Sequence, residues 1–218
     1  MRNLFNYDNP LMSGLAKFFR LVMLDALWVI FCIPVVTAGA STAAFYYTIQ
    51  KNLKQDRGYT AQCFWDGFRA NLRSATRAWL LFLAAGLVLF LDLGVLAYLS
   101  SAGHGSAWLD IVLYVLLAVL LSYAIWTLAC IARFENTLRA TLKNAAILAA
   151  ANPGRSLLIL LLVVFCAFAV WVLPMALLVL PGACLWLASV LIEPVFRANM
   201  TDAQRRQEDA WNTRSRGD

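Results

Sequence analysis

The positively charged residues of this chain occur in four clusters, which are separated by long stretches of almost entirely apolar sequence. All 18 Lys and Arg residues fall in residues 2–20, 51–77, 133–155 and 197–216. A Lys or Arg at the centre of a transmembrane helix opposes insertion by roughly 2.5–3.5 kcal/mol, so the clusters belong in water or among lipid headgroups. The pattern is therefore typical of a protein that crosses a membrane several times.

The composition agrees with this interpretation. Hydrophobic residues make up 62% of the 218 residues, charged residues make up 14%, and the mean hydropathy is +0.70. Soluble domains are only about 45–50% apolar. None of the five Cys residues forms a CxxC pair, so the sequence supports neither a zinc site nor a redox pair. We expect one all-α membrane domain at 1–200 and a polar cytoplasmic tail at 201–218, with no cofactor or metal.

The charge distribution also predicts the number of membrane crossings. The apolar stretches predict spans at about 15–36, 40–54, 78–100, 107–131, 156–173 and 175–196. The second span is short and rather polar, so either its neighbours must shield it or the bilayer must thin around it. Without this span the chain has five crossings. With it, all basic residues lie on one side, as the positive-inside rule favours. We therefore expect a bundle of six transmembrane helices, with five as the alternative, and both termini on the cytoplasmic side of the membrane.

Two basic stretches between the spans predict amphipathic cytoplasmic helices. Between residues 58 and 79, aromatic residues recur at helical spacing, and Arg69, Arg73 and Arg77 form a basic ridge on another face. Such a ridge suits the anionic headgroups of the inner leaflet. The second helix, at 133–146, carries polar residues that membrane topology does not require. We expect these residues either to dock a partner or simply to pack on the bundle. They are Arg133, Glu135, Asn136, Lys143 and Asn144.

Three acidic residues lie within apolar stretches: Asp25, Asp92 and Glu193. A carboxylate inside a membrane must be paired, hydrated or neutral, so each is a candidate for a functional polar site. In the structural alternative, the two Asp side chains accept hydrogen bonds from neighbouring helices and Glu193 pairs with Arg197. His104, in the outer loop, has no second ligand or nucleophile nearby in the sequence, so we expect no metal or acid–base chemistry there.

Three ordered segments of the chain resemble the YesL family of bacterial membrane proteins, whose molecular function is undefined. The segments are LWVIFCIPVVTAGASTAAFYYTIQKNL, GYTAQCFWDGFRANLRSATRAW and RFENTLRATLKNA, and the likeness extends from about residue 5 to residue 200. The resemblance implies an accessory membrane component found with carbohydrate uptake systems of the ATP-binding-cassette (ABC) type. It implies no catalytic residue.

The sequence thus favours a non-enzymatic accessory or assembly subunit whose partners are membrane lipids and ABC permease or ATPase subunits. The chain has no GxxxxGK[ST] string, so we expect it not to hydrolyse ATP itself. Basic ridges beside membranes commonly bind lipid, so we expect no nucleic-acid partner. The alternative is an autonomous small-solute transporter or channel that uses Asp25, Asp92 and the broken segment at 34–39. Polar side chains converging on a water-accessible path would favour that alternative.

Overall fold

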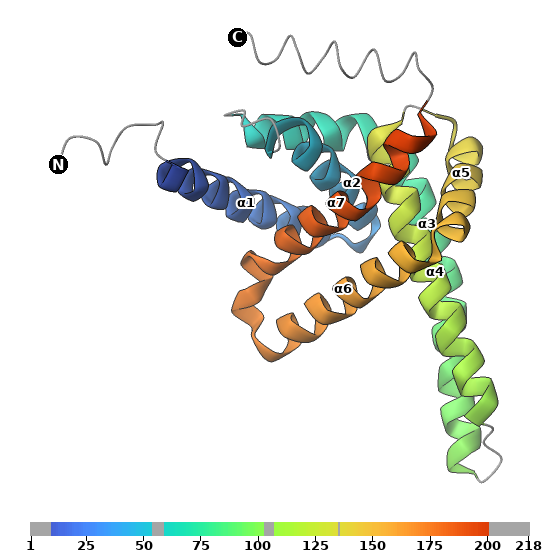
Figure 1. The fold of residues 1–218 in the computed structure, drawn as a ribbon. Helices are drawn as coiled ribbons and strands as arrows, with labels where there is room; N and C mark the ends of the chain where they lie inside the picture. The colour runs from blue at the N-terminus through green and yellow to red at the C-terminus, as the bar shows by residue number, and fades with distance from the viewer. Residues whose placement is uncertain (1–9, 54–58, 103–106, 135, 201–218) are drawn as a thin grey trace, which may run out of the picture.

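The computed structural model describes residues 10–53, 59–102, 107–134 and 136–200, and these residues form helices and no strand (Figure 1). The α-helices are α1 (Pro10–Cys32), α2 (Ala38–Thr48), α3 (Thr60–Ser101), α4 (Ala107–Arg133), α5 (Leu138–Ala151), α6 (Pro153–Val172) and α7 (Leu180–Asn199). The 3-10 turns η1 (Val35–Thr37) and η3 (Pro174–Leu178) precede α2 and α7, and a π-helical segment, η2 (Ile49–Leu53), extends α2.

Four of the described helices are long and apolar enough to cross a membrane: α3, α4, α6 and α7. Only 6% of the most apolar segment of α3, and 11% of that of α6, is buried within the protein. So much exposed apolar surface is not stable in water and requires lipid around it. The protein is therefore an all-α, membrane-embedded, multi-pass protein, as the sequence predicts at this level.

The first two helices differ from the membrane-crossing helices predicted at 15–36 and 40–54. α1 carries Lys17, Arg20 and Asp25, and α2 has only 11 residues, about 16 Å at 1.5 Å per residue. Neither has the length and composition of a membrane-crossing helix. Figure 1 shows α1 lying across the long axis of the α3–α4 hairpin, and the turn between α1 and α2 stops well short of the far ends of α3 and α4. The structure therefore does not support six full crossings.

α2 is the central helix of the bundle, and it packs mainly against α3 and also against α1, α4 and α7. Of its 11 residues, 8 are buried. Most of the buried residues are small, which lets the helix backbones approach closely. A Cβ added at Gly39 would collide with the side chain of Trp79 and approach the carbonyl oxygen of Ala75. Neighbouring helices thus shield this short helix from lipid.

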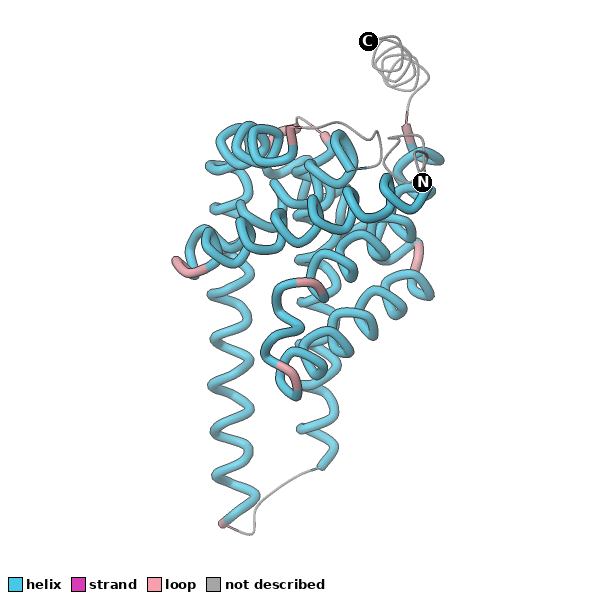
Figure 2. The backbone as a smooth tube through the Cα atoms, turned by 90° about the vertical axis from the view of Figure 1, so that its left-hand side faces the viewer, coloured by secondary structure: helices cyan, strands magenta, loops and turns pink. Residues whose placement is uncertain are grey.

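α3 joins the predicted amphipathic helix and the following span into one helix of 42 residues. On its first part, Phe64 and Phe68 are buried against Phe31 of α1, with ring centroids 5.7 and 4.9 Å from that of Phe31. Trp79 Nε1 donates a hydrogen bond of 2.7 Å to the carbonyl oxygen of Val35, which fixes η1 against α3. Figures 1 and 2 show that α3 begins at the end of the molecule where α7 ends, and that its last turns lie beside α4 at the opposite end.

α6 and α7 form a second hairpin, which η3 joins (Figure 2). The helix α6 ends at Val172, immediately before the Leu173–Pro174 step at which the sequence predicts a break. A proline has no backbone N–H to continue the helical hydrogen bonding, so the chain turns here. α7 then returns along α6 and ends next to α5 and the last turn of α4 (Figure 1).

Candidate functional site

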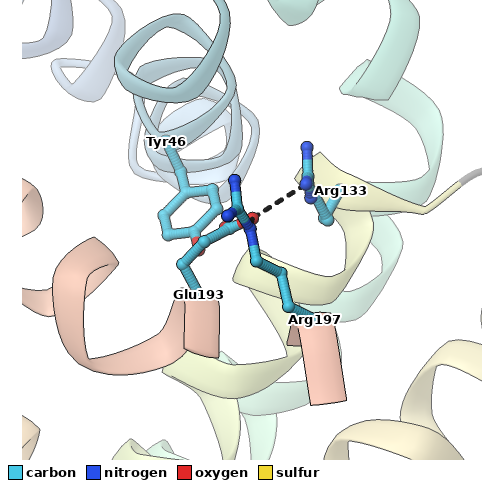
Figure 3. A network of polar contacts seen from close by, with 4 residues as sticks. All are labelled: Tyr46, Arg133, Glu193 and Arg197. Carbon is cyan, nitrogen blue, oxygen red and sulfur yellow. Dashed lines mark hydrogen bonds and ion pairs between the residues drawn. The ribbon is translucent and has the colours of Figure 1, made fainter. Parts of the chain in front are cut away.

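A buried ion pair joins the last turn of α4 to α7. Arg133 Nη2 donates to Glu193 Oε1 at 2.8 Å, and the two side chains are only 15% and 10% exposed. Arg197 Nε lies 3.9 Å from the same oxygen, one helical turn later on α7. Tyr46 of α2 donates its hydroxyl to Glu193 Oε2 at 3.5 Å. Figure 3 shows Tyr46 and both guanidinium groups arranged around the Glu193 carboxylate.

This arrangement assigns a structural role to two residues that the sequence places among candidate sites. The sequence pairs Glu193 with Arg197, and the structure adds Arg133 as the nearer cation. The Arg133–Glu193 pair joins α4 to α7. Removing either partner would leave the other charge buried and uncompensated, so the pair holds the two helices together. The Arg133 guanidinium points toward Glu193, so the exposed docking candidates among the described residues are Asn136, Lys143 and Asn144.

A cleft of about 270 Å³ lies beside this ion pair, between the end of α4, the helix α5 and the end of α7. Its floor contains Phe134 and Phe196, whose rings pack edge to face with centroids 5.3 Å apart. The cleft is lined by Cys130, Phe134, Asn136, Thr141, Asn144, Ile147, Leu148, Phe196 and Asn199. Its surface is therefore amphipathic, with amide and hydroxyl groups around an aromatic floor.

Two asparagines of the cleft have amide groups that a partner can use. Asn136 and Asn144 are exposed, and within the described residues no hydrogen bond engages their side-chain amides. The other polar groups of the cleft are already bonded within their own helices: Asn199 Nδ2 donates to Val195 O at 2.8 Å, and Thr141 Oγ1 donates to Thr137 O at 3.1 Å. An asparagine amide both donates and accepts, so Asn136 and Asn144 can bind the backbone of a second chain.

The structure does not bring the three acidic candidates into one site. Glu193 pairs with Arg133, Asp92 is exposed on α3, and Asp25 is fully buried on α1. The Asp25 carboxylate lies against the first turn of α7, where a Cβ at Gly182 would collide with it. No side chain within the described residues donates a hydrogen bond to Asp25, and the backbone N–H of Gly182 is the donor that faces the carboxylate.

The basic ridge lies on the exposed side of the first part of α3. Arg69, Arg73 and Arg77 are all exposed. The Arg69 guanidinium lies over the ring of Trp65, 4.7 Å from its centroid, and Trp65 is itself exposed. An exposed Trp beside exposed Arg residues is the combination that suits the boundary between headgroups and acyl chains.

Several residues of the site have no signal in the sequence. Tyr46 meets Glu193 across 147 positions, and nothing in its small-residue segment indicates a polar partner. Thr141 and Asn199 line one cleft because the first turns of α5 lie near the end of α7, an arrangement that only the tertiary structure shows. An Asn in the last turn of an apolar helix next to Arg197 is the only local hint of a polar surface there.

Two residues considered in the sequence analysis, Glu135 and His104, lie outside the described residues. Within the described ranges, no group of three or more His, Cys, Asp or Glu side chains is placed to hold a metal ion.

Residues 21–93 match the model of a family described as "Protein of unknown function, DUF624", the family that contains YesL-like membrane proteins. The matched segment runs from α1 through α2 and most of α3, so it includes Asp25, Asp92 and the basic ridge. The cleft between α4, α5 and α7 lies outside it. No curated protein and no solved structure matches the chain.

Proposed function

We propose that this chain is a non-enzymatic membrane accessory or assembly subunit that associates with an ABC-type carbohydrate uptake system. The observation that carries the proposal is the amphipathic cleft, where the amides of Asn136 and Asn144 stand beside an aromatic floor. Such a surface suits docking to the permease or ATPase subunit of the importer. The association with carbohydrate uptake comes only from the resemblance of three segments to the YesL family, because the DUF624 match carries no function.

The proposal includes a topology in the bacterial cell membrane. The described basic residues near the start of α1, in η2 and at the ends of α4 and α7 would all lie on the cytoplasmic side, as the positive-inside rule favours. In place of two full crossings, α1 and α2 form a hairpin that enters the membrane from the cytoplasm. The apolar turn of this hairpin supports the arrangement, because Ile33 is 75% and Val35 is 60% exposed and both need lipid around them. Both termini and the cleft are then cytoplasmic.

A docking variant tests the function. Changing Asn136, Lys143 and Asn144 together to Ala leaves buried contacts intact, because all three side chains are exposed. The variant should accumulate in the membrane at the native level and recover about tenfold less permease and ATPase subunit on co-purification, a loss equivalent to 1.4 kcal/mol. Retention of every importer subunit would place the docking surface elsewhere. Unchanged carbohydrate uptake in cells that lack the chain would contradict the association itself.

A second candidate function is an autonomous small-solute transporter or channel, and one observation favours it. Asp25 is fully buried, and no side chain within the described residues donates a hydrogen bond to it. Intramembrane carboxylates of this kind often mark ion or substrate pathways. The change Asp25→Asn separates the two functions, because it keeps hydrogen-bonding capacity and removes the charge. Normal protein level with loss of solute uptake would favour the transporter, whereas normal uptake favours the accessory subunit.

A further inference from the structure

We infer that the cleft between α4, α5 and α7 binds an acidic segment of a partner protein that carries a large apolar side chain. The inference rests on the proposed docking function and specifies the chemistry of the partner. Its first support is charge. Arg139 and Lys143 are exposed on α5, the helix that forms one side of the cleft, and α5 has no acidic residue.

The start of α5 adds to this positive potential. Thr137, the N-cap residue of α5, makes no side-chain hydrogen bond to the first turn, so the backbone N–H groups there are not capped by it. Uncapped N–H groups and the helix dipole give the N-terminus of a helix a partial positive charge. Asn136, which lines the cleft, immediately precedes this helix end. A carboxylate bound near Asn136 would therefore meet the helix terminus as well as the basic side chains.

The floor of the cleft specifies the apolar part of the partner. Phe134 and Phe196 form an edge-to-face pair, and Ile147 is 55% exposed at the side of the cleft. Pockets for drug-sized molecules measure roughly 300–1,000 Å³. The present cleft, at about 270 Å³, is below that range. It therefore fits one large side chain with its adjacent backbone, while Asn136 and Asn144 bind the backbone amides.

Two other occupants have part of this chemistry. An anionic lipid headgroup would satisfy the basic residues and would accept hydrogen bonds from the amides, but it carries no large apolar group for the aromatic floor. The chain's own residues 201–218 contain Glu208, Asp209 and Trp211, and they follow Asn199 of the cleft directly in the sequence. Both occupants are separated from a partner segment by the experiment below.

The experiment measures peptide binding to the full-length protein in phosphatidylcholine nanodiscs by fluorescence anisotropy. The probes are a labelled Asp-Glu-Trp-Leu-Glu-Asp peptide and its counterpart Lys-Arg-Trp-Leu-Arg-Lys. The acidic peptide should bind at least about tenfold more tightly than the basic one, and its affinity should fall as salt is raised. The double change Arg139→Gln with Lys143→Gln should weaken acidic-peptide binding about tenfold. A matched control, Arg73→Gln with Arg77→Gln, removes the same charge from the ridge and should leave binding unchanged.

Four results would overturn the inference. Equal binding of the two peptides would show that the cleft has no charge preference. An equal loss in the ridge variant would show that binding follows overall charge. Displacement of the acidic peptide by added phosphatidylglycerol in the native protein, but not in the ridge variant, would place the peptide on the lipid-binding ridge. Tenfold tighter binding after the combined change Glu208→Gln, Asp209→Asn and Trp211→Ala would make the tail the occupant.

The outcome is separable from that of the proposed function. If the docking variant loses importer subunits but the native protein binds no acidic peptide, only the partner chemistry is wrong. If the peptide binds as expected but no importer subunit co-purifies and uptake does not depend on the chain, only the carbohydrate-uptake association is wrong.

Discussion

The Asp25 carboxylate occupies the space that a side chain at position 182 would need. A Cβ at Gly182 would collide with Asp25 Oδ2 and come close to Leu21, and Asp25 is fully buried with no room to withdraw into solvent. The change Gly182→Ala should therefore destabilise the protein by about 1–3 kcal/mol, the usual range for overpacking. The loss is measured as a lower midpoint of thermal unfolding in detergent.

The control and the rescue for this prediction lie in the same protein. Gly94, on the exposed side of α3, has no atom near the position of an added Cβ, so Gly94→Ala should be neutral or stabilising by up to about 1 kcal/mol. Combining Gly182→Ala with Asp25→Ala should restore part of the lost stability, because the two changes share one contact. Equal unfolding midpoints for Gly182→Ala and Gly94→Ala would show that α1 and α7 separate easily.

The ion pair between Arg133 and Glu193 predicts that changing one partner destabilises the protein more than changing both. The single change Glu193→Gln leaves the Arg133 charge mostly buried without its carboxylate, and breaking such a pair destabilises a protein by roughly 3–5 kcal/mol. The double change Arg133→Met with Glu193→Leu removes both charges and should be more stable than either single variant. The measurement is the monodisperse fraction after detergent extraction. A Glu193→Gln variant as stable as the native chain would mean that water solvates the Arg133 guanidinium in place of the carboxylate.

At the scale of the elements, the sequence predicts those helices whose formation depends on a local pattern of apolar residues. The apolar stretches predict an all-α membrane protein, and the helical spacing of aromatics after residue 58 corresponds to the first part of α3. Because residues 40–54 are few and rather polar, the sequence requires either shielding by neighbouring helices or a thinner bilayer around them. The structure shows shielding, since α2 is buried at the centre of the bundle. Hydropathy alone cannot distinguish lipid from packed helices as the surroundings of an apolar segment.

The candidate site shows the same division between local and tertiary information. The exposed amides of Asn136 and Asn144 could be selected from the sequence because topology alone does not require them. The partner of Arg133 could not, because Glu193 lies 60 positions away and Arg197 offers a simpler partner four residues along the same helix. Likewise, the sequence marks Asp25 as a buried acid, but only the fold places it against the first turn of α7.

The apolar turn between α1 and α2 gives a prediction for labelling. Val35 is 60% exposed in the protein, yet a turn inside the bilayer is shielded from water-soluble reagents. A cysteine at Val35 should therefore not react with a membrane-impermeant maleimide from either side, above the background of the native cysteines. A cysteine at Ser101, at the far end of α3, should react from outside. Labelling of position 35 from outside would restore two full crossings for α1 and α2.

At the scale of the whole molecule, positive charge is concentrated at one end. Figure 1 shows that the start of α3, the helix α5 and the end of α7 lie toward the same end, and these elements carry most of the described basic residues. The last turns of α3 and the first turns of α4, at the opposite end, carry no basic residue within the described ranges. The molecule is therefore strongly polarised along the direction that the α3–α4 hairpin takes through the membrane.

This charge distribution predicts that anionic lipid stabilises the protein and that the basic ridge accounts for most of the effect. Each Lys or Arg near an anionic membrane surface contributes about 1 kcal/mol, so Arg69, Arg73 and Arg77 together should contribute roughly 3 kcal/mol. The native protein should therefore unfold at a higher temperature in nanodiscs that contain phosphatidylglycerol than in pure phosphatidylcholine. Changing the three Arg residues to Gln should remove most of this difference while leaving stability in phosphatidylcholine nearly unchanged, because all three side chains are exposed and the buried contacts of Phe64 and Phe68 remain. A lipid dependence that survives the triple change would mean that the basic ends of α5 and α7, rather than the ridge, contact the anionic leaflet.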